Sequence, residues 1–550
     1  MIKVVDNLDE IEKAHSYLGN RFPEASRYQR DSLKSIDYKT AIEIVEDNLN
    51  KDSYILDCGA SSDPTPGYLS ELGYEHLYAI DLDKNITDMP YYWRIKYMYG
   101  SMLNTHFPDN MFDAVITVSS IEHGEGVPQA KRFIDESKRI LKDGGLLFIT
   151  TEYNEAHIDT KGMKLYGLQW KIFDRSEITS IINYARSIGF EPYIDGSFPK
   201  QKGTITYNKR LEKGYSFVLL AFRLKKKMKA NPIREVNIIC ASLGKVDGIS
   251  KYSESLARRF AEAGIKAHLY RKEGEIENKH IPVILEYDTQ NGSVMPQNKK
   301  TIIELHSPPA SRKVLVNQMF KLLDPRAPFW RNPIGRLRKH ISSEKALSSL
   351  EDWPLLMFNN ELAEEAGITK YTLMPHIAYP KINYKKKTKR GICIGSFGFA
   401  LKNKHFDKIC ARAKRLGVRA VIVVSSPNVN PTVENESKQI VKKLREDYES
   451  DKIKIVDSYD DVRTLGELSV CTHMIFAQEG MRGISGSMRF AMALNVPVIA
   501  TDSYPARETQ AHRVKNLNDI TIDYLKKTTE PTKLDDGFVY LLKFLESRHD

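Results

Sequence analysis

Short apolar runs alternate with amphipathic stretches along most of the chain, and turn residues separate them. In the first half, apolar runs that end in polar residues indicate β-strands, and stretches with helical spacing lie between them. The expected elements are strands at 54–56 and 76–80, a strand within 111–123, a helix, Gly-Gly turn and strand across 133–153, a helix across 173–192 and a strand within 214–227. Strands that alternate with helices imply a parallel sheet.

The second half repeats this alternation in two series, separated by the lysine-rich run Lys385–Lys389. The first series is expected across 236–271, 301–309 and 354–380, and the second places strands at 391–397, 419–426, 452–459, 470–477 and 496–502, with helices across 400–418 and 484–495. Each series predicts a Rossmann-like lobe. The predicted fold class is therefore α/β, with three Rossmann-like parallel-sheet units.

A chain of 550 residues is too long for one hydrophobic core, so several domains are expected. A basic stretch that contains Pro232 marks a linker between the two halves. The predicted organisation is an N-terminal helical extension (1–29), a first domain (30–227), a basic linker (228–234), two lobes (235–384 and 385–515) and a C-terminal helical tail (516–550).

Composition places the chain among ordinary globular proteins, with 41% hydrophobic and 28% charged residues. The five cysteines are scattered without a CxxC pair, which favours a reducing compartment and argues against a zinc site. The N-terminus has no apolar segment of signal-peptide type, and no apolar run approaches the roughly 20 residues that span a bilayer. A cytoplasmic protein without a metal site is the resulting expectation.

Charge is divided unevenly between the two halves. Residues 1–222 contain 26 Lys and Arg against 33 Asp and Glu, whereas residues 223–550 contain 56 against 38. The overall net charge of +11 therefore arises from the second half. Such asymmetry indicates two modules with different partners.

The most informative stretch is 54–83, YILDCGASSDPTPGYLSELGYEHLYAIDLD. An apolar strand runs into Asp57 and Gly59, and a turn rich in Ser, Pro and Gly follows. A small-residue turn at the end of a strand allows a ligand to approach the backbone closely. Asp81, at the tip of the next strand about 20 residues on, can accept hydrogen bonds from both ribose hydroxyls. This arrangement predicts a site for an adenosine-type cofactor.

In their order and spacing, the first-half segments resemble the class I S-adenosylmethionine-dependent methyltransferases. The resemblance implies S-adenosylmethionine as cofactor, with Asp81 on its ribose and with Asp57 and Gly59 beside its methionine part. Ser101 and Met102 lie where the family usually contacts adenine. This sequence has Ala60, Ser61, Ser62 and Asp63 at the positions where further glycines are usual.

Methyl transfer requires a positioned acceptor and, for a hydroxyl acceptor, removal of its proton. Glu122 and His123 follow a strand at the carboxyl edge of the predicted sheet, and an imidazole suits the role of general base. A structural role for His123 is the alternative. An Asn/Asp-Pro-Pro-aromatic run, typical of nucleobase amino methylation, is absent because Ser119–Ile121 stand there. Its absence favours an oxygen acceptor.

Three segments of the second half resemble the two-lobed, B-type nucleotide-sugar glycosyltransferases, especially the retaining family 4 group. GKVDGISKYSESLARRFAEAG, which contains Gly248, is similar to the first-lobe glycine loop and helix, and LHSPP places His306 at a strand end. EG…FAMALNVPVIATD (479–502) is similar to the donor-site signature, with Glu479 as its first acid. The resemblance implies a nucleotide-sugar donor, contacted by His306 and Glu479. Phe490 stands where a second glutamate normally binds the donor ribose.

The resemblance also implies a diphosphate site in the second lobe. Basic residues after a strand, and the free N–H groups at the start of a helix, both favour phosphate. The predicted contacts are Lys402, Lys404, Ser485, Gly486 and Ser487, with additional charge from Arg482 and Arg489. Each site also has a structural interpretation: an exposed loop for the two lysines, a helix-start acid for Glu479 and a core or capping histidine for His306.

Residues 311–340 contain eight Lys and Arg against one Asp, with Phe320, Phe329 and Trp330 interleaved. This composition suits peripheral contact with an anionic membrane surface, at its cytoplasmic face, or binding of a lipid-phosphate acceptor. RNA binding from charge alone, and a solvated helix and loop, are the alternatives.

Taken together, these features predict a bifunctional transferase of glycan biosynthesis, such as a surface polysaccharide or lipopolysaccharide pathway. One module adds a sugar to a glycan or lipid-linked glycan, and the other methylates a sugar hydroxyl, with no nucleic-acid partner. Two alternatives stay open: an RNA-modifying methyltransferase whose basic half binds nucleic acid, and a methyltransferase fused to a catalytically inactive glycan-binding scaffold.

Overall fold

The chain folds into two compact units, Met1–Ala230 and Asn231–Asp550. The division falls inside the stretch 228–234 for which the sequence predicts a linker. The computed structural model describes residues 1–61, 63–194, 196–225, 233–245, 247–278, 281–288, 296–298, 300–307, 353–358, 360–374, 376–379, 382–385, 387–388, 391–427, 431–478, 485–532 and 536–546.

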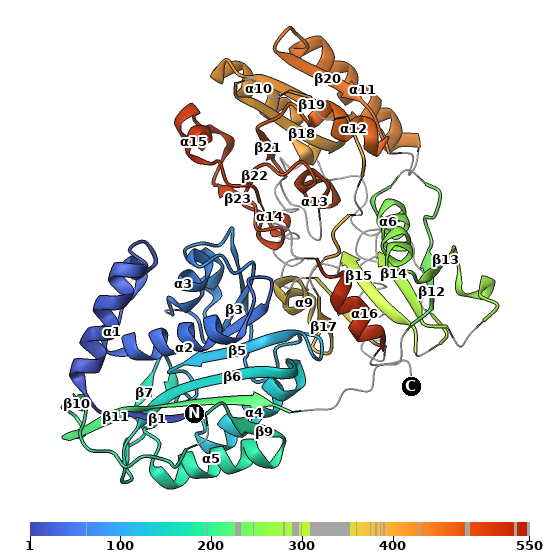
Figure 1. Cartoon of the computed structure of the whole chain (residues 1–550). Helices are drawn as coiled ribbons and strands as arrows, with labels where there is room; N and C mark the ends of the chain where they lie inside the picture. Colours follow the sequence, from blue (N-terminus) through green and yellow to red (C-terminus); the bar gives the residue numbers. More distant parts are fainter. Residues whose placement is uncertain are drawn as a thin grey trace, which may run out of the picture. The chain divides into compact units, whose positions relative to one another are not determined.

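A nine-stranded sheet forms the centre of the first unit, and its main path runs β1-β11-β6-β5-β2-β3-β4 (Figure 1). The path strands are β1 (Ile2–Val5), β2 (Tyr54–Cys58), β3 (His76–Asp81), β4 (Ile95–Tyr99), β5 (Phe112–Val118), β6 (Leu141–Tyr153) and β11 (Lys213–Leu224). Strands β2 to β6 are parallel to their neighbours, whereas β11 is antiparallel to β6. The carboxyl ends of five strands therefore meet at one edge of the sheet.

Three short strands pair with successive parts of β11. Strand β1 pairs with it along 217–220, β9 (Phe190–Pro192) along 222–224 and β10 (Thr206–Asn208) along 213–215. The first residues of the chain thus belong to the sheet. Within residues 1–29, for which the sequence predicts a helical extension, the backbone of 2–5 pairs with β11 and α1 follows it.

Helices cover both faces of this sheet (Figure 1). On one face lie α1 (Leu8–Arg21), α2 (Ser35–Asn48) and α3 (Thr65–Glu71), and on the other α4 (Val127–Ile140) and α5 (Arg175–Ser187). Alternate strand residues such as Ile55, Ile116 and Phe148 share one core with α1 and α2. Burial of both faces explains why these strands read as continuous apolar runs in the sequence.

Between β6 and α5 the chain forms a small hairpin, β7 (Lys164–Leu165) and β8 (Leu168–Gln169). Helix α5 then begins at a capping box, in which the Asp174 carboxylate accepts the Glu177 N–H and the Glu177 carboxylate accepts the Asp174 N–H. Both contacts satisfy N–H groups that the helix leaves unpaired.

The second unit contains two six-stranded sheets, and all paired strands in both are parallel. The first has the order β13-β12-β14-β15-β16-β17, from β12 (Glu235–Cys240), β13 (Lys266–Tyr270), β14 (Val283–Asp288), β15 (Ile302–Ser307), β16 (Leu355–Met357) and β17 (Thr372–Leu373). The second has the order β20-β19-β18-β21-β22-β23, from β18 (Cys393–Phe399), β19 (Arg419–Ser425), β20 (Ile453–Asp457), β21 (His473–Phe476), β22 (Val498–Thr501) and β23 (His512–Val514).

Helices separate and cover these strands. They are α6 (Gly248–Glu262), α9 (Asn360–Ala366), α10 (Phe406–Leu416), α11 (Pro431–Tyr448), α12 (Asp461–Leu468), α13 (Gly486–Met492), α14 (Tyr504–Glu508), α15 (Ile522–Lys527) and α16 (Phe538–Glu546). Two apolar cores lie on opposite faces of the second sheet, one with α12 and α13 and the other with α10 and α11. The C-terminal α16 packs on α6, where the Phe538 ring meets Phe260 at 5.1 Å.

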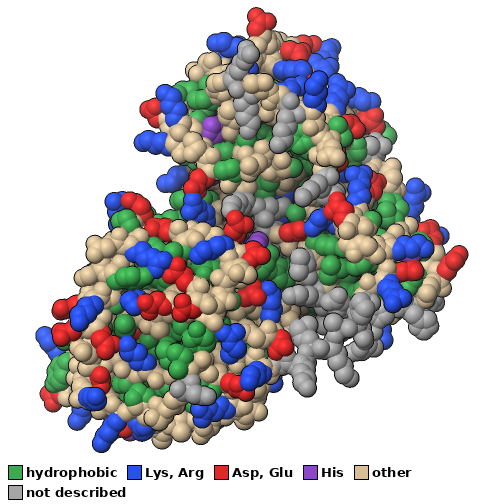
Figure 2. All heavy atoms as spheres, viewed as in Figure 1, with side chains coloured by type: hydrophobic (Ala, Val, Ile, Leu, Met, Phe, Trp, Pro, Cys, Tyr) green, Lys and Arg blue, Asp and Glu red, His purple; other side chains and the backbone are tan. Residues whose placement is uncertain are grey.

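The structure confirms an α/β protein with several parallel-sheet units. Sequence reasoning missed strand β14, whose run IPVILEYD it did not interpret. Within the described ranges, no helix has the length and apolarity needed to cross a membrane. All five cysteines are buried, and none of them forms a disulfide. On the face shown in Figure 2, the first unit carries acidic and basic side chains interspersed.

Candidate functional site

The turn after β2 lies close to the end of β5. Gly59 has a φ of 82°, and its N–H donates to the Ile80 carbonyl at 2.9 Å. A Cβ at Gly59 would come within 2.1 Å of Ser120 Oγ. Only glycine therefore fits this turn, both for its left-handed conformation and for the space beside Ser120.

Asp81, at the tip of β3, organises the same turn. Its Oδ2 accepts the Ser61 N–H at 3.1 Å, and its Oδ1 accepts the Asp83 N–H at 2.7 Å. The Gly100 N–H donates to the Asp81 carbonyl at 2.8 Å, which brings the turn with Ser101 and Met102 to the same strand end. Each Asp81 oxygen keeps a second lone pair, so the partly exposed carboxylate can still accept ribose hydroxyls.

Asp57 and Asp63 form a buried acidic pair beside the turn. Asp57 is 2% exposed, and neither of its carboxylate oxygens has a hydrogen-bond partner among the described residues. Burial, followed by the charges of Asp63 and Asp81, raises the pKa of Asp57 well above its ordinary value. Burial also raises the pKa of Asp63 to about 6. A cationic group placed here would stabilise the ionised pair.

His123 lies in the loop after β5, which the β7–β8 segment contacts. The Gly124 N–H donates to the Gln169 carbonyl at 2.7 Å, and the Tyr166 ring lies 5.5 Å from the imidazole in an edge-on arrangement. His123 Nδ1 is buried without a hydrogen-bond partner. Burial, with the nearby charge of Lys34, lowers the pKa of His123, so its imidazole is neutral and able to accept a proton.

A group of charged side chains that the sequence did not reveal lies next to His123. Glu122 accepts the Thr151 hydroxyl at 2.9 Å, Asp37 accepts the Thr150 hydroxyl at 3.1 Å, and Glu152 accepts the indole N–H of Trp170. Burial raises the pKa values of Asp37 and Glu122 to about 7 and that of Glu152 to about 8, while Lys34 lowers all three. We call Lys34, Asp37, Glu122 and Glu152 the Lys34 cluster.

Only part of this cluster had a signal in the sequence. Glu152 ends the apolar run of β6, and polar residues at a strand's carboxyl end are typical of ligand sites. Lys34 and Asp37 lie at the start of α2, where charged residues are common on solvated helices. Their burial depends on the packing of α2 over β5 and β6, which no local pattern reveals.

The first sheet of the second unit buries the histidine predicted to contact a sugar. His306 Nε2 lies 2.5 Å from Glu286 Oε2, and the imidazole is 5% exposed. The rings of Tyr252, Phe358 and His376 surround it. Among the described residues, His306 thus has Glu286 as an internal hydrogen-bond partner.

Gly248 opens helix α6 at the carboxyl edge of the same sheet, directly after the N-cap Asp247. The Asp247 carboxylate accepts the Ser250 N–H at 2.8 Å and the Ser242 hydroxyl at 3.0 Å. The glycine loop and helix therefore have the predicted placement, with the helix start capped by the protein's own carboxylate.

The two predicted diphosphate lysines differ in their surroundings. Lys402 lies in the short 3₁₀ turn after β18, with a side chain that is 79% exposed and 3.7 Å from Glu436. Lys404 is 8% exposed, and burial lowers its pKa to about 8. An anion beside Lys404 would stabilise its ammonium form.

The Ser-Gly-Ser segment before α13 also lies at a strand end. Ser485 is the N-cap of α13: its hydroxyl oxygen accepts the Met488 N–H at 3.3 Å and the Gln478 amide N–H at 3.0 Å. Gly486 starts the helix, and Ser487 approaches Gly398 of β18. Lys402, Lys404 and this segment thus follow strands β18 and β21, which are neighbours in the sheet.

Two expectations near this segment are corrected. Arg489 is buried, ion-paired with Glu508 and bonded to the His376 carbonyl at 3.1 Å, so it is not available to phosphate. Phe490 is 1% exposed and packs against Phe397 and Tyr379, which explains why an acid is absent there. Glu479, Arg482 and the basic segment 311–340 lie outside the described residues.

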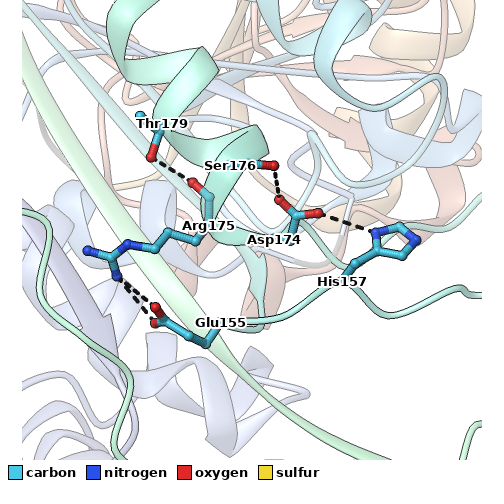
Figure 3. Close-up of a pocket in the computed structure, with 6 residues that line it drawn as sticks. All are labelled: Glu155, His157, Asp174, Arg175, Ser176 and Thr179. Atoms are coloured by element: carbon cyan, nitrogen blue, oxygen red, sulfur yellow. Dashed lines mark hydrogen bonds and ion pairs between the residues drawn. The ribbon is translucent and has the colours of Figure 1, made fainter.

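A cavity of about 530 Å³ lies at the end of β6 and the start of α5 (Figure 3). Glu155, His157, Asp174, Arg175, Ser176 and Thr179 line it. Arg175 pairs with Glu155 at 3.1 Å, and Asp174 with His157 at 3.3 Å. The lining charges therefore satisfy one another.

Two groups among the described residues have metal-ligand chemistry: His157, Asp174 and Glu177, and the buried set Glu286, Glu304 and His306. In the first, the Asp174 carboxylate caps α5. In the second, the imidazole of His306 already pairs with Glu286. Both carboxylate oxygens of Glu304, however, are buried without a hydrogen-bond partner among the described residues.

The sheet order defines the first unit as a Rossmann-like domain. Residues 56–149 match the family model described as a methyltransferase domain. The first unit thus contains a class I S-adenosylmethionine-dependent methyltransferase domain. No curated protein matches the chain.

Solved structures that match the chain include an S-adenosylmethionine-dependent methyltransferase from Methanosarcina mazei, with 16% identity over 34% of this chain and 98% of that one, at a TM-score of 0.26. Another is the 1,6-didemethyltoxoflavin-N1-methyltransferase of Burkholderia thailandensis, with 14% identity over 41% and 95% of the two chains, at a TM-score of 0.26. The [4+2]-cyclase SpnF matches with 13% identity over 40% and 97%, at a TM-score of 0.27.

Proposed function

We propose that the first unit transfers a methyl group from S-adenosylmethionine to a hydroxyl of a glycan. The observation that carries this proposal is the meeting of Gly59, Asp81 and His123 at one sheet edge within the matched methyltransferase domain. When bound, S-adenosylmethionine supplies a sulfonium methyl group, and its transfer to oxygen leaves a neutral thioether.

The residues of this edge fit such a cofactor. Gly59 leaves backbone space that a Cβ would fill, and Asp81 keeps acceptor capacity for ribose hydroxyls. Asp57 presents a buried carboxylate without a partner, which suits the positive charge of the methionine part. In this arrangement Ser101 and Met102 lie on the adenine side.

His123 is placed to take the acceptor's proton. Its neutral imidazole has a free Nδ1, and the loop that carries it is fixed by the Gly124–Gln169 hydrogen bond. The Ser-Ser-Ile sequence before Glu122, in place of an amino-methylation motif, supports an oxygen acceptor.

For the second unit we propose nucleotide-sugar-dependent glycosyl transfer, so that the chain is a bifunctional transferase of polysaccharide or lipopolysaccharide biosynthesis. Two parallel sheets, the lysines after β18 and the capped start of α13 support it. The acceptor would be a glycan or lipid-linked glycan, with 311–340 at the cytoplasmic membrane face. The core position of Phe490 favours a second candidate, an inactive glycan-binding scaffold.

Calorimetric titration of the full chain with S-adenosylmethionine tests the first part. We expect Asp81→Ala to weaken binding by about 10- to 100-fold, since about 1.4 kcal/mol corresponds to each factor of ten. Asp83→Asn is the matched control, because Asp83 also bonds the turn, through the Ser61 hydroxyl at 3.0 Å, but ends no strand. Equal binding by wild type and Asp81→Ala would overturn the assignment.

Titration with a panel of nucleotide sugars tests the second part. We expect Lys404→Met to lose most of the affinity for a bound donor and Lys402→Ala to lose less. Lys438→Ala is the control, because its exposed side chain pairs with Glu434 much as Lys402 pairs with Glu436. A chain that binds no nucleotide sugar would favour the scaffold.

A further inference from the structure

Lys34 is a buried cation without an ionic partner. It ends a 3₁₀ turn and precedes α2, its exposure is 7%, and its Nζ has no hydrogen-bond partner. The ammonium lies 3.5 Å from the centroid of the Phe217 ring. Cation–π contact compensates only part of the cost of removing an ammonium from water. The position of Lys34 therefore calls for an additional acceptor.

Three carboxyl groups lie within electrostatic reach of this ammonium, and none of them pairs with it. Lys34 lowers the pKa values of Asp37, Glu122 and Glu152, which places all three within its electrostatic reach. No ion pair joins Lys34 to any of them in the part of the chain that the structure describes. The Phe217 residue beneath Lys34 is the cross-strand neighbour of Glu152. A small group between cation and carboxylates would bond to both.

The Lys34 cluster adjoins the predicted cofactor turn. The Thr150 hydroxyl that donates to Asp37 also accepts the Ser119 N–H at 3.1 Å. Ser120, the next residue, approaches Gly59 so closely that its Oγ lies 3.4 Å from the Gly59 carbonyl oxygen. Continuous contacts therefore lead from the turn after β2 to the cluster.

We propose that the Lys34 cluster is the acceptor site, and that it binds an uncharged hydroxyl group of a sugar-like polyol. Lys34 donates a hydrogen bond to the hydroxyl oxygen, and Glu152 accepts the hydroxyl hydrogen. A hydroxyl both accepts and donates, so it satisfies the cation and the carboxylate together. An anionic group only accepts, so it cannot donate to a carboxylate of the cluster. The proposal rests on the methyl transfer proposed above.

The same contacts suit the chemistry. The hydroxyl O–H bond breaks and its proton passes to Glu152 in its ionised form, directly or through the neutral imidazole of His123. A new O–CH₃ bond forms as the methyl–sulfur bond of S-adenosylmethionine breaks, and that electron pair stays on sulfur. Lys34 stabilises the negative charge that develops on the acceptor oxygen. The indole of Trp170, which bonds Glu152, fixes the carboxylate in place.

Stability of the free protein tests the role of Lys34 without any acceptor. Scanning calorimetry with and without S-adenosylhomocysteine identifies the transition of the first unit as the one that shifts. If Lys34 serves to bind a ligand, Lys34→Met removes an unpaired buried charge from the free protein. The transition temperature of the first unit should then rise by roughly 2–4 °C, which corresponds to about 1 kcal/mol of unfolding free energy. Lys39→Met, on the same helix and paired with Glu43 near the surface, is the control. A clear fall in the Lys34→Met transition would assign Lys34 to the fold and overturn the proposal.

Methyl transfer tests the ligand class. The probes are neutral methyl hexopyranosides and the corresponding hexuronates, with S-adenosylmethionine labelled in its methyl group. We expect transfer to a neutral member, about 100-fold less with Lys34→Met or Glu152→Gln, and S-adenosylhomocysteine affinity within about twofold of wild type. Preferred transfer to a hexuronate, or full transfer by Lys34→Met, would overturn the site. If no probe is methylated, the calorimetric result decides. If the wild-type protein does not bind S-adenosylhomocysteine, the proposed function itself is refuted.

Discussion

The two units use their charged residues in different ways. In the first unit, buried polar atoms of Asp57, His123 and Lys34 lack partners and lie around one strand-end turn. In the second unit, two described charges near strand ends have internal partners, since Arg489 pairs with Glu508 and His306 with Glu286, whereas the buried carboxylate of Glu304 has none. Unpaired buried polar groups are costly and uncommon in folded proteins.

This difference distinguishes buried polar residues that stabilise the fold from those that a bound ligand would complete. A buried group with a full set of internal partners stabilises the protein whether or not a ligand is bound. A buried group with no partner lowers stability unless a ligand completes it. By this criterion the described residues support a ligand site in the first unit more strongly than in the second. Three experiments test the contrast.

The largest effect is expected from the buried ion pair of the second unit. Arg489 and Glu508 side chains are 1% and 2% exposed, and burial lowers the pKa of Arg489 to about 9. Arg489→Met leaves Glu508 buried without its cation, which we expect to cost about 3–5 kcal/mol of unfolding free energy. Guanidinium denaturation of the full chain measures this loss.

Two controls sharpen this result. The double variant Arg489→Met/Glu508→Leu should recover most of the stability, because no unpaired charge remains. Lys438→Met, which removes an exposed pair with Glu434, should change stability by less than about 1 kcal/mol. Unchanged stability of Arg489→Met, together with weaker nucleotide-sugar binding, would show that Arg489 serves a ligand and would reverse the comparison.

Much of the fold could be predicted from the sequence because both faces of each sheet are covered. The apolar runs of β2, β5 and β6 indicate strands that the structure confirms, whereas the run of β14 was not interpreted. Asp81 and Gly59 could also be predicted from the sequence, because both belong to a local strand-turn-strand pattern. The residues of the proposed acceptor site could not be predicted. Lys34 and Glu152 are separated by more than 100 residues, and only the packing of α2 on the sheet brings them together.

His306 and Arg489 show the opposite case, in which the sequence predicts a ligand contact and the structure shows an internal partner. Both were predicted to contact ligands from their place after or near a strand. Glu286, on the strand β14 that the sequence did not indicate, and Glu508, on α14, provide their partners. Residue type and position restrict the chemistry, but the tertiary partner decides whether a charge is free to bind a ligand.

The next largest effect is expected at Gly59 of the first unit. Gly59→Ala imposes a left-handed backbone on a residue with a Cβ and directs that Cβ at Ser120 Oγ. We expect a loss of S-adenosylhomocysteine affinity of about 100-fold, or roughly 2.8 kcal/mol, measured by calorimetric titration. Gly73→Ala has the same backbone strain, with a φ of 83° and no atom within 4 Å, and should retain affinity. Equal losses of S-adenosylhomocysteine affinity in the two variants would show that backbone strain alone causes the effect.

The smallest effect concerns how Glu122 couples stability to pH. Burial raises its pKa to about 7, whereas an unfolded glutamate titrates near 4.3. Between these values the folded state holds a proton that the unfolded state has lost, so stability falls as pH rises, by at most about 1.4 kcal/mol per pH unit. Glu122→Gln should reduce the slope of the first unit by this contribution between roughly pH 5 and 7, as its calorimetric transition reports. Glu125→Gln, an exposed acid in the same loop, is the control. An unchanged slope in Glu122→Gln would show that Glu122 does not hold the additional proton in the free protein.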